Sequence, residues 1–204
     1  AESIVFEWAF AQAPQIHASL AALFSGMYPT TNGLRAPGDY LADEATTLAE
    51  ILGAAGYTTA AFIEGGASDS DYGLAQGFGS YQTTGAPGAD AAAWLAAHAD
   101  EEFLLVVGGW SRVALEQVEA LLADSGRPEG LSARVQEVLA SRAAGDAIGF
   151  DEGDLEWVRA WYAARTQVVD SLLGKFLQEV RALGLDRRAI VVVLGSNGFA
   201  LQEH

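Results

Sequence analysis

The chain contains no cysteine, one lysine and three histidines among its 204 residues. Without cysteine the protein has no disulfide bond, no thiolate metal site and no cysteine nucleophile. The histidines, His17, His98 and His204, are too few and too scattered along the sequence to predict a zinc site. The lack of cysteine also leaves the redox compartment of the protein open.

Long apolar runs are missing as well. The densest stretches, FLLVVGG at 103–109 and AIVVVLG at 189–195, have the length of β-strands and fall far short of a membrane span. The opening residues AESIVFEWAF lack a basic region and a cleavage site, so no signal peptide is predicted for this chain. We therefore expect no direct membrane insertion.

Positive charge is scarce, because 11 lysines and arginines face 27 acidic residues and the net charge is −16. Such a field repels nucleic acid and anionic membrane surfaces. It also repels phosphate and sulfate esters unless a metal or an arginine cluster inverts the local sign. A well-solvated acidic surface accounts for this composition, which salt-adapted proteins share. Nucleic acid is therefore not expected as a partner.

The composition is that of a globular protein, since half of the residues are hydrophobic. The length suffices for one large domain with its own core, and a single domain over 1–204 is predicted. Ile4, Phe6, Trp8 and Phe10 recur every second residue, which predicts a strand over 3–10. Further strands are predicted at 58–64, 102–109 and 188–195, the last two of them buried.

Helical spacing of apolar residues predicts helices between these strands. Their expected ranges are 17–29, 43–57, 89–100, 113–124, 131–143 and 154–183. Residues 65–87 are predicted as loop, and Asp154 is the expected N-cap of the last helix. Trp157 and Trp161 share one face of that helix and are expected to pack together.

Strands that alternate with helices predict an α/β fold with a mostly parallel central sheet flanked by helices. In such sheets the functional crevice lies beyond the carboxyl ends of the strands. The segments expected there are 11–19, 64–80, 108–113 and 195–204.

Several of these segments resemble the sulfatase family, within the alkaline phosphatase superfamily. The stretch APQIHASLAALFSGMYPTTNGL at 13–34 resembles the family signature, which is Cys or Ser, any residue, Pro-Ser-Arg, and then Leu, Thr-Gly and Tyr-Pro. Four later segments resemble family segments in the same order, at 46–62, 73–82, 103–113 and 162–204. The resemblance implies an alkaline-phosphatase/sulfatase-like fold and a location that is exported, periplasmic or extracellular.

The reacting half of the signature differs from the family pattern. In the family the first Cys or Ser becomes a formylglycine nucleophile, and Ile16 occupies that place. Ala18 stands at the proline position, Ser19 matches the family serine, and Leu20 replaces the arginine. An isoleucine has no lone pair to attack sulfur or phosphorus, and a leucine supplies no charge to hold the nucleophile.

The segment that resembles the family's metal loop also differs. Ser196 stands where the family has an aspartate, and Asn197 offers only a weak oxygen ligand. Hard cations such as Ca²⁺ depend on carboxylates. The strand-end histidine falls on Gly108, and the Asp and His after it fall on Ser111 and Val113. The family's preceding acidic strand and its smaller C-terminal subdomain have no counterpart in this sequence.

The sequence therefore predicts a catalytically inactive sulfatase-like domain that binds a ligand or is a structural subunit of a complex. No cofactor is expected. A protein partner is expected, because a missing first strand would leave an edge of the sheet open. The alternative is a sulfate- or phosphate-ester hydrolase dependent on Ca²⁺ or another divalent metal. Its fallback nucleophile would be Ser19 with His17, which lie two residues apart and would face each other poorly on a helix.

Overall fold

The computed structural model describes residues 3–65, 72–109, 115–123 and 152–198, together with residues 133 and 137. These residues belong to two compact units. Unit 1 comprises residues 1–108 and 183–199, and unit 2 comprises residues 109–182 and 200–204. The single domain over 1–204 stays a prediction.

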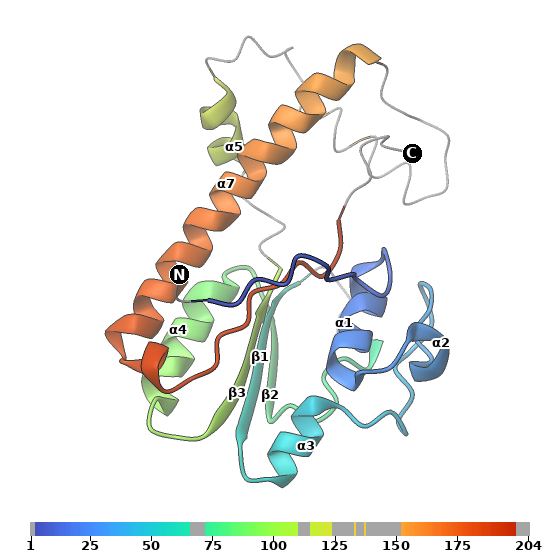
Figure 1. The fold of residues 1–204 in the computed structure, drawn as a ribbon, viewed down its shortest axis with the longest axis vertical. Helices are drawn as coiled ribbons and strands as arrows, with labels where there is room; N and C mark the ends of the chain where they lie inside the picture. The colour runs from blue at the N-terminus through green and yellow to red at the C-terminus, as the bar shows by residue number, and fades with distance from the viewer. Residues whose placement is uncertain are drawn as a thin grey trace. The chain divides into compact units, whose positions relative to one another are not determined.

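The centre of unit 1 is a sheet of three parallel strands (Figure 1). β1 (Thr58–Glu64) lies between β2 (Ser80–Thr84) and β3 (Phe103–Gly108). The α/β fold and the parallel sheet are thus confirmed, as are the strands predicted at 58–64 and 102–109. β3 is half-buried along its whole length rather than fully buried. β2 was predicted as loop, because its residues SYQTT are mostly polar and carry no apolar period.

Four α-helices in the described part of unit 1 precede or connect its strands. They are α1 (Ile16–Ser25), α2 (Pro29–Asn32), α3 (Leu48–Ala54) and α4 (Pro87–His98). α1 ends at Gly26, which adopts φ +66° and donates its N–H to the Ala22 carbonyl. α3 is shorter than the predicted helix over 43–57, because a capping box between Thr47 and Glu50 starts it at Leu48.

The apolar face of α1 forms the main core of unit 1. Ala18 and Ala21 of α1 are fully buried, and Leu20 and Phe24 are nearly so. They pack in one cluster with Val106 of β3 and with buried residues of the segments before and after α1: Ala13, Leu34, Leu41, Ala45 and Leu74. This packing fixes the start of α1 relative to the loops at 34–41 and 72–74.

Two predicted strands are wrong. Residues 3–10 and 188–195 have no strand conformation and pair with none of β1, β2 and β3. Their large side chains face solvent, with Trp8 84% and Ile190 95% exposed. Apolar composition gave these predictions, but a strand also needs a neighbour for its backbone hydrogen bonds, and composition does not identify one.

The described part of unit 2 is a pair of helices, α5 (Leu115–Leu122) and α7 (Glu152–Ala182). Both were predicted, although α7 begins two residues before the expected N-cap Asp154. Val118 and Leu122 of α5 pack with an apolar stripe of α7: Val158, Trp161, Ala164 and Val168. Trp157 packs against this cluster, to which Trp161 belongs, and direct contact of the two tryptophans stays a prediction. Of the helix predicted at 131–143, residues 133 and 137 are described and are helical, and the other residues lie outside the described ranges.

In unit 1 the short helix η2 (Leu185–Arg187) precedes the exposed segment at 190–194. Across the described parts of both units, no helix combines the length and apolar character needed to cross a membrane.

A polar junction joins the start of α3 to the turn before β2. Glu50 accepts hydrogen bonds from the Thr47 backbone N–H (2.8 Å) and the Gln76 side-chain amide (3.0 Å). These donors, led by the Thr47 N–H, lower the pKa of Glu50. Gly77 adopts φ +84° beside them, and a Cβ there would lie 2.5 Å from the Glu50 backbone nitrogen. The junction therefore requires glycine at position 77.

We expect Gly77→Ala to lower the free energy of unfolding by about 3 kcal/mol, because left-handed strain and a backbone clash add together. Gly56→Ala is the matched control, since Gly56 adopts φ +95° and a methyl group at this position would meet no atom within 4 Å. It should lose only about 1 kcal/mol from strain. Urea unfolding measures both, and equal losses would contradict the tight contact at Gly77.

Candidate functional site

The first turn of α1 borders a cavity of about 260 Å³. Its lining comes from three stretches of unit 1: Gln15, Ile16, His17, Ala18, Leu34, Ala36, Pro37 and Tyr72. The structure thus brings the predicted site residues Ile16 and His17 together with Tyr72, from the loop predicted to border the crevice. The loop at 34–37, which we call the 34–37 wall, was not predicted to line the site. It directly follows the signature-like stretch and contains a proline typical of a tight loop.

An aromatic stack forms one side of this cavity. The His17 imidazole lies on the Tyr72 ring with centroids 4.0 Å apart and planes inclined by 18°. The Tyr72 carbonyl accepts a hydrogen bond from the Leu41 backbone N–H (2.9 Å), which anchors this loop to the core. His17 is therefore placed as part of an aromatic wall.

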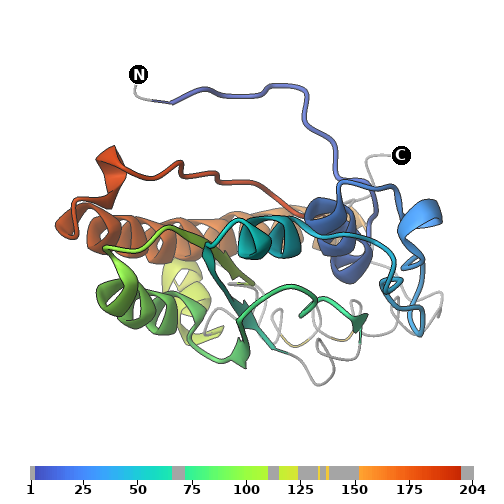
Figure 2. The ribbon, with the colours of Figure 1, turned by 90° about the horizontal axis from the view of Figure 1, so that it is seen from below.

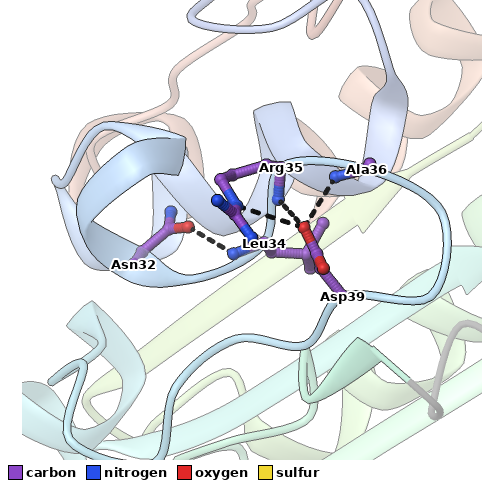
Figure 3. A network of polar contacts seen from close by, with 5 residues as sticks. All are labelled: Asn32, Leu34, Arg35, Ala36 and Asp39. Atoms are coloured by element: carbon purple, nitrogen blue, oxygen red, sulfur yellow. Dashed lines mark hydrogen bonds and ion pairs between the residues drawn. The ribbon is translucent and has the colours of Figure 1, made fainter.

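The 34–37 wall is held by polar contacts of its own backbone (Figure 3). The buried Asn32 accepts the Leu34 N–H at Oδ1 (3.0 Å), and Asp39 Oδ2 accepts the N–H groups of Arg35 (3.1 Å) and Ala36 (3.2 Å). The Arg35 Nε also binds Asp39 Oδ2, at 3.3 Å. The Arg35 backbone N–H is the main cause that lowers the pKa of Asp39, and the guanidinium adds to it.

These contacts determine whether the charged side chain of Arg35 reaches the cavity. Arg35 lies next to two lining residues, but its guanidinium binds Asp39 and does not line the cavity. Among the described residues that line it there is no acidic, lysine or arginine side chain. The described lining therefore consists of aliphatic groups, two aromatic rings and one amide.

Ser19, the fallback nucleophile, lies on the buried side of α1 and is 7% exposed. Its hydroxyl donates a hydrogen bond to the backbone carbonyl of Ser196. The single hydroxyl proton of Ser19 is thus directed to a carbonyl oxygen, which is not a general base. The same bond attaches the loop at 195–198 to α1.

The loop at 195–198 provides a poor set of metal ligands. The Ser196 hydroxyl donates to the Asn197 side-chain oxygen (3.1 Å), so the two predicted metal-loop positions bind each other. Neither carries a carboxylate, and hard cations select carboxylate oxygens. Within the described residues, no three His, Cys, Asp or Glu side chains gather as a metal site would require. The donors present in this loop do not fit a divalent cation.

Of the remaining positions named from the sequence, those that the structure describes do not line this cavity. Gly108 ends β3, while Ser111, Val113 and His204 lie outside the described residues. His98, at the end of α4, contacts Glu101 Oε1 through Nδ1 (3.0 Å) and stacks on Trp94. His98 therefore has a structural role at the helix end.

The whole sequence also matches a known family. The match is to the family model described as Sulfatase, over residues 1–204. The chain belongs to the sulfatase family. A search of curated proteins finds no match. In this sulfatase-family chain the cavity lies at the helix start where the resemblance places the nucleophile.

We expect Ser19→Ala to release the loop at 195–198 from α1, because the side-chain bond to the Ser196 carbonyl is lost. Hydrogen exchange of the Ser196, Asn197 and Gly198 amides should accelerate, and stability should fall by about 1 kcal/mol. Ser80→Ala in β2 is the control and should leave this loop unchanged. Unaltered exchange at 196–198 in Ser19→Ala would contradict the attachment.

Proposed function

We propose that this sulfatase-family chain does not hydrolyse esters and acts by binding, alone or as a subunit of a complex. The observation that carries the proposal is which residues stand at the start of α1. Ile16 stands at the nucleophile position, and the nearby hydroxyl of Ser19 is buried and bonded to the Ser196 carbonyl. A nucleophile needs a lone pair, an exposed approach and a base to remove its proton.

The charges that sulfuryl or phosphoryl transfer requires are also replaced. Transition states of these reactions carry negative charge that metal ions, lysines or arginines must stabilise. Leu20 occupies the arginine position and packs in the core at 9% exposure. Ser196 occupies a position where a carboxylate would hold the metal. The alternative hydrolase would have to supply both charges from elsewhere.

The cavity itself favours an uncharged ligand. The N–H groups at the start of α1 attract an anion by about 0.3–1 kcal/mol through the helix dipole. Removing a sulfate from water without a cationic partner costs several kcal/mol, and the net charge of −16 adds repulsion. A volume of about 260 Å³ accommodates one small ring, so a neutral aromatic compound is the ligand class that fits.

Hydrolysis assays test the absence of activity. The purified chain should show no turnover of p-nitrophenyl sulfate or p-nitrophenyl phosphate above background with Ca²⁺, Mg²⁺, Mn²⁺ or Zn²⁺ added. Turnover that disappears with a chelator would overturn the proposal. Ser19→Ala is then the discriminating variant, because loss of that turnover would assign the nucleophile to Ser19, and its retention would exclude this residue.

Ligand titration tests the binding role. Phenol should shift the amide resonances of residues 15–18 and 34–36 at millimolar concentration. Phenyl sulfate should shift them at least about tenfold less at equal concentration, because no cationic group in the described lining is available to pair with its sulfate. Ile16→Asp places a carboxylate at the cavity wall and should weaken phenol binding. Preference for phenyl sulfate would contradict an uncharged ligand class.

A further inference from the structure

The segment Ile190–Leu194 is an unusual exposed surface. Its five residues are all large and aliphatic, and their side chains are 50–95% exposed. Single exposed apolar residues are common, but a contiguous apolar patch of this kind is typical of an interaction site. The run IVVVL also has the composition of a strand that is covered on both faces.

Both ends of this segment are attached to the rest of unit 1. Before it, the Arg188 guanidinium donates to the Ala99 carbonyl (2.8 Å) and lies 4.0 Å from the Asp100 carboxylate, just ahead of β3. After it, the Ser196 carbonyl accepts the Ser19 hydroxyl of α1. The segment is thus held between two anchors, and it pairs with none of the strands of the described sheet.

The same chain carries a second exposed apolar segment, Ile4–Phe10, which we call the N-terminal arm. Ile4, Phe6, Trp8 and Phe10 are 74–84% exposed, and the Trp8 and Phe10 rings lie 6.5 Å apart. In a strand conformation, residues with this two-residue spacing would share one face. Figure 2 shows the arm running apart from the 190–194 segment, which it overlaps only in the view of Figure 1.

We propose that the arm of one copy of this chain pairs with Ile190–Leu194 of a second copy, so that two chains exchange arms reciprocally. The arm and the segment are both apolar and of strand length, and neither pairs with a strand of the described sheet of its own unit. In a two-fold exchange, the arm of each copy covers the 190–194 segment of the other, so the apolar surfaces of both copies are buried together. Backbone hydrogen bonds of an added strand would supply the affinity.

The low charge of the two segments permits this occupant. The molecule has a net charge of −16, so a second copy is repelled wherever acidic surfaces meet. The arm from 4 to 10 carries only Glu7, and the segment from 190 to 194 carries no charge. These two segments are therefore a surface on which two acidic copies can approach at low electrostatic cost.

Cysteine cross-linking tests the exchange directly, because the natural chain has no cysteine. Copies carrying only Glu7→Cys are mixed with copies carrying only Val192→Cys and treated with a short bis-maleimide, so that a cross-link between the two can form only between chains. The expected product is a covalent heterodimer. Copies carrying Gln82→Cys, an exposed position on β2, replace the Val192→Cys copies as control and should give background yield.

The double variant Glu7→Cys/Val192→Cys separates pairing within one chain from pairing between chains. Cross-linked monomer from this variant, with no heterodimer from the mixed single variants, would overturn the exchange and assign the arm to its own chain. Absence of cross-linking above the Gln82→Cys control in both experiments would overturn any pairing of the two segments.

Light scattering with size-exclusion chromatography measures the same association without cross-linking. The natural chain should form a dimer whose Kd rises at least about tenfold in either Phe6→Ser or Val192→Lys, with little further rise in the double variant, because both substitutions disrupt one interface. Ile51→Lys on α3 alters another exposed aliphatic residue and should leave Kd unchanged. A monomer at all concentrations, or a dimer indifferent to these substitutions, would refute the proposal.

Discussion

The packing of the apolar face of α1 is the interaction on which the rest of the site depends. Ala18 and Ala21 are fully buried because small side chains let the helix approach its neighbours closely. Phe24 then fills the space beside Phe78, with ring centroids 5.4 Å apart. This contact sets the position of the first turn of α1, and both the cavity and the Ser19–Ser196 bond follow from that position.

The residues of the first turns of α1 serve this packing. Ala18 and Leu20 are core residues, and Ile16 packs against the core while it lines the cavity. In an active site, charged and polar groups at such positions are held at a cost in stability. Aliphatic residues avoid that cost, so the start of α1 contributes to the stability of the fold. The polar contacts of Asn32, Asp39 and Glu50 stabilise loops and helix ends.

Sequence and structure agree where local signals are complete. The apolar runs of β1 and β3 combine a strand preference with a partner strand beside them. Sequence and structure disagree at 3–10 and 188–195, where the apolar pattern is real but no neighbouring strand is present in the described sheet. They also disagree at β2, whose polar residues form a strand because β1 offers them an edge. Pairing, rather than propensity, decided all three cases.

By itself the sequence determined the class of fold and the family, since these depend on residue identity and spacing along the chain. Only the tertiary structure decided which groups meet: that His17 stacks on Tyr72, that the 34–37 loop borders the cavity, and that the Ser19 hydroxyl binds the Ser196 carbonyl across 177 residues of chain. It also decided that one of the most apolar runs of the sequence lies exposed. Such contacts arise between segments far apart in the chain, and their partners are selected by the folded backbone rather than by any local pattern.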